Sequence, residues 1–180
     1  FIDTALSLNG DTATSVITPG APQNVSISYT NKLTTSVTNA VVTIGLTGSA
    51  IDYNSIQATS GFYNSSDHTI VFNRDTDPSL GTLAPGASGI GSFSFSTLPA
   101  GSVMSSPNVT FTTSVSGTRV GQTNVPEQVT ATASKTVKVA TTVLLTASSL
   151  HSSGTLVNTG PIPPRAGQIT TYTVAWNVAN

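Results

Sequence analysis

Two of the few acidic residues in this sequence lie close together, in a segment that could bind a cation. Asp75 and Asp77 are separated by one residue and are followed by Pro78. Calcium takes several oxygen ligands, and an Asp-x-Asp loop supplies two of them. The same pattern is also typical of a turn in which an aspartate accepts a hydrogen bond from nearby backbone. To complete a site, Asp52 or Asp67 would have to approach this segment in the fold. We therefore predict that the protein binds no metal, and Asp75 and Asp77 are the residues that would hold calcium if it did.

The other reactive side chains do not form a catalytic pattern. The histidines, His68 and His151, are far apart in the sequence, and no Gly-x-Ser-x-Gly motif is present. The chain has no cysteine, which excludes disulfides and thiolate catalysis. A self-formed lysine–asparagine or lysine–aspartate bond needs a desolvated lysine, and the candidates Lys32, Lys135 and Lys138 lie at predicted strand ends or beside polar residues. We therefore predict that the protein is not an enzyme and uses no cofactor.

Three aromatic residues could form an exposed contact surface. Tyr53, Phe62 and Tyr63 are less clearly part of a buried pattern than the other aromatic residues. Aromatic rings on the outside of a β-sandwich can bind sugars, so a surface glycan or a host-cell partner is one candidate ligand. The alternative is that these rings pack in the core or in turns, because large exposed apolar patches are uncommon.

The composition limits the classes of partner. Charged residues make up 7% of the chain and the formal net charge is −1, against about 25% charged residues in typical soluble domains. Disordered chains combine low hydrophobicity with high net charge, so this composition favours a folded protein. The basic residues are scattered, which argues against a nucleic-acid partner. No apolar stretch approaches the roughly 20 residues of a membrane helix, so we expect no membrane contact by this segment.

Apolar and hydroxyl residues alternate along most of the chain. Val25, Ile27 and Tyr29, for example, fall on one side of a segment whose other side is serine and threonine. This period of two is typical of strands with one buried face. The strands that we predict are residues 3–8, 22–31, 38–46, 50–58, 68–73, 88–97, 108–117 and 127–139. Turns rich in glycine and proline separate them, so we predict an all-β, immunoglobulin-like antiparallel β-sandwich.

The start of the chain is repeated near its end. Residues 4–8 resemble residues 142–146, and a Gly/Pro loop and an alternating segment follow each. Aligning Gly20 with Gly167 pairs Val25 with Tyr172, Ile27 with Val174 and Tyr29 with Trp176. A repeat of roughly 140–147 residues has the length of a domain.

We therefore expect a complete β-sandwich module over residues 1–139. Residues 140–180 would be the N-terminal strands of a second, truncated module, at 141–148 and 168–178, in a longer tandem array. One face of these strands would be strongly apolar, and its residues are Val143, Leu145, Tyr172, Val174 and Trp176. Isolated two-stranded units are marginal in water, so we expect this face to be covered by the first module, by another copy of the chain or by the rest of the second module.

The order of motifs resembles a known family. A Pro-Gly loop leads to a strand that ends in Tyr29-Thr30-Asn31, and Leu80-Gly81-Thr82-Leu83-Ala84-Pro85-Gly86 precedes the strand around Phe93 and Phe95. Residues 160–176 look like the opening of another such repeat. This pattern is similar to the bacterial surface repeat called DUF11. The resemblance implies export to the cell surface of a bacterium or archaeon, within a large stalk-like or adhesin-like protein, and it implies no catalytic residues.

These observations predict a non-enzymatic structural module of a tandem-repeat cell-surface or filament protein, which acts as a spacer or scaffold. Its expected partners are neighbouring modules or copies of the same chain, and its expected location is extracellular, on a prokaryotic cell. Two alternatives remain: an adhesin or carbohydrate-binding module, and a self-assembling fibre subunit that exchanges strands through the incomplete second module.

Overall fold

The computed structural model describes residues 1–180 except 103–105, 122, 142, 153 and 180. The chain divides into two compact units, Phe1–Ala140 and Thr141–Asn180. The sequence places a boundary after residue 139, one residue earlier.

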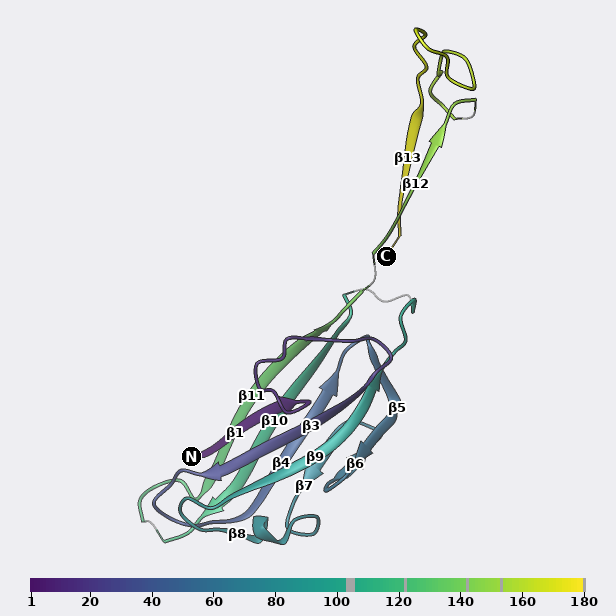
Figure 1. The fold of residues 1–180 in the computed structure, drawn as a ribbon. Helices are drawn as coiled ribbons and strands as arrows, with labels where there is room; N and C mark the ends of the chain where they lie inside the picture. Colours follow the sequence, from purple (N-terminus) through teal and green to yellow (C-terminus); the bar gives the residue numbers. More distant parts are fainter. Residues whose placement is uncertain (103–105, 122, 142, 153, 180) are drawn as a thin grey trace. The chain divides into compact units, whose positions relative to one another are not determined.

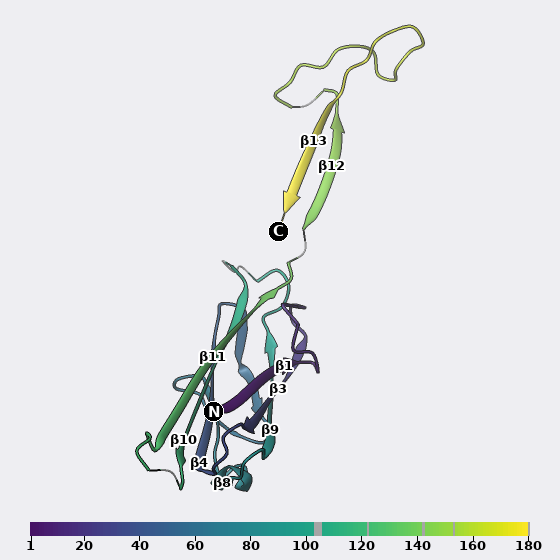
Figure 2. The ribbon, with the colours of Figure 1, turned by 90° about the vertical axis from the view of Figure 1, so that its left-hand side faces the viewer.

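The first unit is a sandwich of two β-sheets (Figures 1 and 2). One sheet has the strand order β1-β3-β9-β5, and the other has the order β2-β11-β10-β4-β7-β6, with β8 paired to β4. The strands are β1 Ile2–Leu8, β2 Val16–Ile17, β3 Pro22–Asn31, β4 Val37–Thr47, β5 Ile51–Ala58, β6 Phe62–Asn64, β7 Thr69–Phe72, β8 Thr82–Leu83, β9 Ser88–Thr97, β10 Asn108–Arg119 and β11 Gln128–Val139. A short 3₁₀ helix, η1 Pro78–Gly81, precedes β8. The predicted all-β sandwich is confirmed.

Among the described strands, one pair differs from the rest in direction. Val16 and Ile17 of β2 run parallel to Lys138 and Val139 of β11, whereas the other strand pairs are antiparallel. The N-terminal segment therefore contributes to both sheets, with β1 in one and β2 in the other.

The apolar residues of the predicted alternating pattern fill the space between the sheets. Tyr29, Phe93 and Phe111 are each at most 2% exposed, and the rings of Phe95 and Phe111 meet edge-on with their centroids 5.8 Å apart. Such rings contribute much of the apolar area that the core removes from water.

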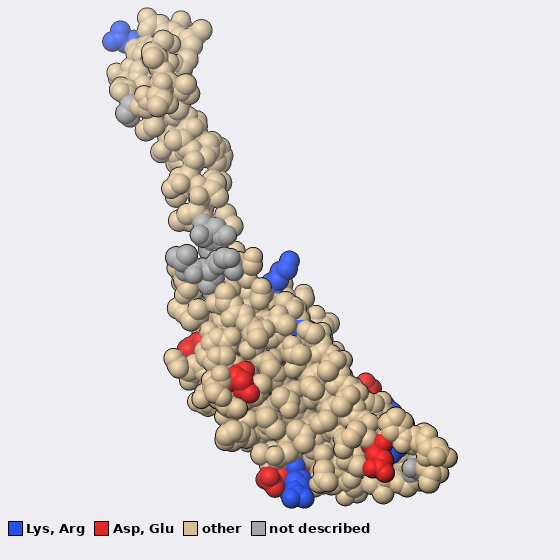
Figure 3. All heavy atoms as spheres, turned by 180° about the vertical axis from the view of Figure 1, so that it is seen from behind, with Lys and Arg blue, Asp and Glu red and all other residues tan. Residues whose placement is uncertain are grey.

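Hydroxyl side chains occupy the outer faces of the sheets. Thr47, Thr110 and Thr136 lie side by side across β4, β10 and β11, and the hydroxyls of Thr110 and Thr136 are 2.8 Å apart. Charged side chains are few and scattered on the face shown in Figure 3. The described residues include one ion pair, Arg74 Nε to Asp75 Oδ1 at 3.8 Å, and it is exposed. Hydroxyls rather than charges therefore make this surface compatible with water.

The second unit is a hairpin with a long loop, formed by β12 Leu144–Leu150 and β13 Thr173–Ala179. Leu145 lies opposite Val178, Ala147 opposite Trp176, and Ser149 opposite Val174. Opposed residues of an antiparallel pair share a face. Leu145, Val174, Trp176 and Val178 are thus on one face, and they are 52–66% exposed.

The hairpin corrects the alignment of the repeat in its first strand. Gly20 and Gly167 both have positive φ, +72° and +75°, as expected for equivalent turns. Tyr29 lies opposite Thr4 in the first unit, whereas its counterpart Trp176 lies opposite Ala147. Ala147 is therefore the structural equivalent of Thr4. The alignment based on residues 4–8 instead paired Thr4 with Thr142, which lies outside the described residues. That alignment was misleading because such a short Thr- and Leu-rich pattern recurs within a few residues.

Candidate functional site

The predicted calcium candidates have other partners in the structure. Asp77 is the N-cap residue of η1: its Oδ1 accepts a hydrogen bond from the backbone N–H of Ser79 at 3.0 Å, and its Oδ2 accepts one from the hydroxyl of Tyr29. Asp75 has an exposed side chain beside Arg74. The two carboxylates are therefore engaged separately, as in the turn alternative. In the described part of the chain, no group of three or more His, Asp or Glu is arranged to hold a metal ion.

The contact between Asp77 and Tyr29 changes the proton affinity of both groups. Burial, the hydrogen bond to Asp77 and the negative charge of Asp77 together raise the pKa of Tyr29 to about 12. Partial burial acts to raise the pKa of Asp77, but hydrogen bonds from Tyr29 and Ser79 outweigh it and lower this pKa below its usual value. The pair is a partly buried polar contact that joins the core to the loop after β7.

The three candidate aromatic residues do not share one surface. Tyr53 stacks on His68 with ring centroids 3.8 Å apart, and the hydroxyl of Tyr63 is 3.1 Å from His68 Nδ1. Phe62 is 64% exposed, but it lies on the face of β6 opposite to Tyr63, because neighbouring residues of a strand point to opposite sides. Tyr53 and Tyr63 pack partly against the core. The structure thus brings Tyr53, Tyr63 and His68 together and leaves Phe62 apart.

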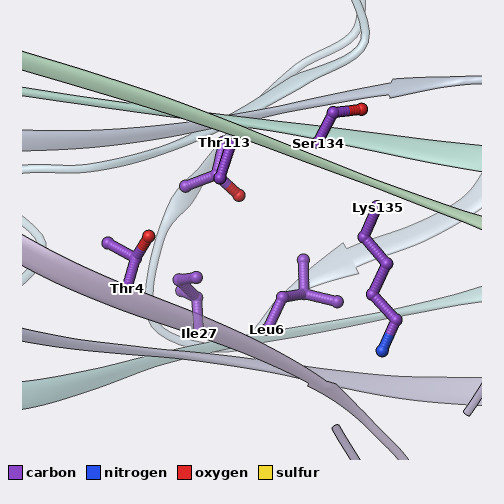
Figure 4. A pocket seen from close by; sticks show the side chains of 7 residues that line it. Thr4, Leu6, Ile27, Thr113, Ser134 and Lys135 are labelled. Carbon is purple, nitrogen blue, oxygen red and sulfur yellow. The ribbon is translucent and has the colours of Figure 1, made fainter. Parts of the chain in front are cut away.

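A small cavity opens between the two sheets at one side of the sandwich. It has a volume of about 100 Å³, and its lining residues are Thr4, Leu6, Ile27, Thr113, Ala133, Ser134 and Lys135. Figure 4 shows the Lys135 side chain extending from β11 beside Leu6. The ammonium group of Lys135 donates a hydrogen bond to the carbonyl of Thr12 at 2.6 Å. Because this lysine has a partner in an exposed setting, the cavity offers no desolvated amine for a lysine–asparagine bond.

The parallel pair β2–β11 joins the beginning and the end of the first unit. The N–H of Lys138 donates to the carbonyl of Ser15 at 2.8 Å, and the N–H of Ala140 donates to the carbonyl of Ile17 at 2.9 Å. Ile17 and Val139 are 5% and 4% exposed, so the junction is also packed in the core. The sequence does not predict β2, because a strand of two residues has no alternation of apolar and polar positions.

The predicted assembly residues lie in the second unit and are exposed. Val143 and Leu145 are 63% and 52% exposed, Tyr172 is 45% exposed, and Val174 and Trp176 are 54% and 66% exposed. Within the second unit itself, no described segment covers this apolar face. What covers it stays a prediction. No described helix is long and apolar enough to span a membrane.

Comparison with known proteins supports the fold. No protein family and no curated protein matches this chain. Among solved structures, the D312A variant of BcpA, the major pilin subunit of Bacillus cereus, has a TM-score of 0.50 and 12% identity, over 99% of this chain and 56% of the pilin chain. A cohesin module from a Clostridium perfringens family 33 glycoside hydrolase has a TM-score of 0.45 and 13% identity, over 78% of this chain and 98% of the cohesin.

One enzyme is among the similar structures. AvmM, which catalyses macrocyclization in alchivemycin A biosynthesis, has a TM-score of 0.45 and 11% identity, over 76% of this chain and 88% of AvmM. At 11% identity this likeness says nothing of the activity of the present chain. The chain spans about half the length of the pilin that it matches.

Proposed function

We propose that this chain is a non-enzymatic spacer module of a prokaryotic cell-surface or filament protein, of the DUF11 type, and that it carries mechanical load. The observation that carries the proposal is the junction between β2 and β11. Through it, the first and last segments of the first unit are held together by parallel backbone hydrogen bonds and buried side chains.

The geometry of this junction suits tension along the chain. In a parallel pair, the N-terminal end of one strand and the C-terminal end of the other lie at opposite ends. A force applied at Phe1 is first carried by β1, whose antiparallel pairing with β3 runs from Ile2 to Leu8. Once β1 has detached, the force reaches β2 and shears it along β11, which loads the hydrogen bonds of the junction together. Several hydrogen bonds must break at once, which gives the module resistance to force.

The test is to stretch single molecules of the full chain between their ends. We expect one distinct force peak that releases about 45 nm of chain, from roughly 140 residues at about 3.6 Å each less the folded length. The absence of a resolvable peak would contradict the load-bearing function.

Two proline variants isolate the junction. Lys138→Pro removes the N–H that donates to Ser15, and we expect it to lower the unfolding force markedly. Thr136→Pro is the matched control, because strand alternation points its N–H to the same side, beyond the end of the β2 pairing. Ala140→Pro, which removes the donor to Ile17, is a second junction variant outside β11. Equal forces in the junction variants and the control would show that the junction bears no load.

A further inference from the structure

The turn that follows β1 contains the single Asn-Gly pair of the sequence, Asn9-Gly10. The N–H of Leu8 donates to the carbonyl of Asp11, and the N–H of Asp11 donates to the carbonyl of Leu8, both at 2.9 Å. Asn9 and Gly10 are thus the two central residues of the turn, and their φ angles are +51° and +85°. Positive φ at both positions is typical of a type I′ turn. Both residues are exposed, so water reaches them.

The amide of the Asn9 side chain is held against β3. Its Oδ1 accepts a hydrogen bond from the backbone N–H of Asn24 at 2.9 Å, and its Nδ2 donates to Oε1 of Gln23 at 2.9 Å. The N–H of Asn9 itself donates to the carbonyl of Asn24 at 2.7 Å. The side-chain oxygen of Asn9 therefore continues the β1–β3 ladder at the point where the backbone turns away.

Gln23 fixes the orientation of the Asn9 amide. Gln23 is 3% exposed, and its Nε2 donates to the carbonyl of Ala21 at 3.0 Å. A backbone N–H needs an acceptor and a backbone carbonyl needs a donor, so Asn24 and Ala21, at the two ends of this series of hydrogen bonds, leave each amide one orientation. Rotation of the Asn9 amide would break its bonds to Asn24 and Gln23 and would leave the buried Oε1 without this donor.

An Asn-Gly pair can react with itself. The backbone nitrogen of Gly10 attacks Cγ of Asn9 and gives up its proton to water, the bond from Cγ to Nδ2 breaks, and Nδ2 takes up a proton and leaves as ammonia. The product is a five-membered succinimide ring, which one water molecule opens to an aspartate or an isoaspartate at position 9. Glycine favours the attack because it has no Cβ to obstruct the approach.

We propose that Asn9 is a deamidation site and that Gln23 suppresses its reaction in the folded protein. The attack requires the nitrogen of Gly10 to lie about 3–3.5 Å from Cγ and to face the plane of the amide. The hydrogen bonds to Asn24 and Gln23 instead hold this amide toward β3. Unfolding, or loss of Gln23, releases it. The inference concerns the covalent integrity of the first unit and goes beyond the proposed function.

The product does not fit the contacts of the asparagine. An aspartate keeps an oxygen for the N–H of Asn24, but its second oxygen replaces Nδ2 and faces Oε1 of Gln23. Gln23 cannot turn its own amide to compensate without losing its bond to Ala21. An isoaspartate adds a methylene to the backbone of a turn that closes with two residues. Deamidation therefore loosens the start of the segment that leads from β1 to β2.

The first experiment follows deamidation of the full chain over time, by mass spectrometry of proteolytic peptides. In urea we expect Asn9 to react faster than Asn64, which precedes a serine. In the folded wild type we expect Asn9 to react more slowly than in urea by about tenfold or more. Equal rates at Asn9 in the folded and unfolded chain, or an Asn9 that reacts no faster than Asn64 in urea, would overturn the inference.

Two variants test whether Gln23 is the protecting residue. Gln23→Met keeps a similar volume and removes both side-chain hydrogen bonds, so we expect deamidation of its folded form to approach the rate measured in urea. Ile70→Val is the control for a general loss of stability, because Ile70 is buried in β7, in the other sheet. Asn9 should stay protected in this control, and circular dichroism verifies that both variants fold. A Gln23→Met chain that reacts as slowly as the wild type, or equal acceleration in both variants, would show that Gln23 does not protect Asn9.

A double-mutant cycle tests the contact without waiting for the reaction. Asn9→Asp should lower the free energy of unfolding, whereas Asn24→Asp, which adds the same charge on the exposed face of β3, should lower it less. In the Gln23→Met background Asn9→Asp should cost less than in the wild type, because the facing oxygen is gone. Strict additivity of the two changes would show that the amides do not face each other and would overturn the inference. The unfolding force of the β2–β11 junction is a separate measurement, so these results leave the load-bearing function to its own test.

Discussion

The hydroxyl of Tyr29 connects the interior of the sandwich to the loop after β7. It donates to Asp77, which also receives the backbone N–H of Ser79 and so begins η1. Removing Asp77 leaves the hydroxyl of the buried Tyr29 without this acceptor, and an unsatisfied buried polar group costs about 1–3 kcal/mol. The aspartate at this position therefore contributes to folding, and its residue type alone does not distinguish this role from calcium binding.

The raised pKa of Tyr29 predicts a loss of stability in alkali. The unfolded chain releases this proton near pH 10, whereas the folded chain holds it to about pH 12. The folded state binds the proton more strongly, so this contribution is complete below pH 10 and is lost as the pH rises through 12. We expect the free energy of unfolding, measured with urea from pH 9 to 12, to decline less steeply in Tyr29→Phe than in the wild type. The same slope in both proteins would exclude Tyr29 as a source of the decline.

Substitutions on the two faces of β9 should differ in their effect on stability. Phe95 is 1% exposed and Ile90, on the opposite face of β9, is 68% exposed. Phe95→Ala should lower the free energy of unfolding by about 3–5 kcal/mol, and Phe93→Ala should do the same. Ile90→Ala is the control and should change it by about 0.5 kcal/mol or less. The measurement is the thermal melting curve of each of the three variants. If Ile90→Ala lowered the melting temperature as much as the phenylalanine variants, the assignment of the buried face of β9 would be contradicted.

At the level of the elements, the sequence predicted those strands whose residues alternate over many positions. β3 and β9 have the predicted bounds, and the other long strands of the first unit differ by one or two residues at their ends. β2, β6 and β8, with two or three residues each, carry no period, and the chain forms them because longer strands already lie beside them. The contact of Tyr29 with Asp77 spans 48 residues of sequence, so no local pattern predicts it.

Two glycines explain how the sheets accommodate Phe72. A Cβ at Gly91 would lie 2.6 Å from the Phe72 ring, and one at Gly61 would lie 2.7 Å from it. We therefore expect Gly91→Ala to lower the free energy of unfolding by about 1–3 kcal/mol, as overpacked cores do. Gly45→Ala, where the nearest atoms are 3.9 and 4.0 Å away, is the control and should be well tolerated. Adding Phe72→Leu to Gly91→Ala should cost less than the sum of the single changes, and strict additivity in urea unfolding would refute the contact.

On the scale of the molecule, the two units differ in what holds them together. The first has a continuous core between two sheets, with 26 buried apolar residues among those that the structure describes. The second has two strands and no buried apolar residue among those described. Because two-stranded units are marginal in water, cooperative unfolding belongs to the first unit, and the order of the second depends on what covers its apolar face.

Trp176 allows the two units to be followed separately. In a dilute, monomeric sample we expect tryptophan emission typical of an exposed indole, since Trp176 is 66% exposed. On heating, far-ultraviolet circular dichroism should show the cooperative transition of the first unit, whereas the emission wavelength should change little, because the ring is already in contact with water. Coincident transitions would mean a single cooperative unit. A blue-shifted emission that moves to the red at the same temperature as the circular dichroism would therefore show that Trp176 is covered within the folded chain, and the two units would then not unfold separately.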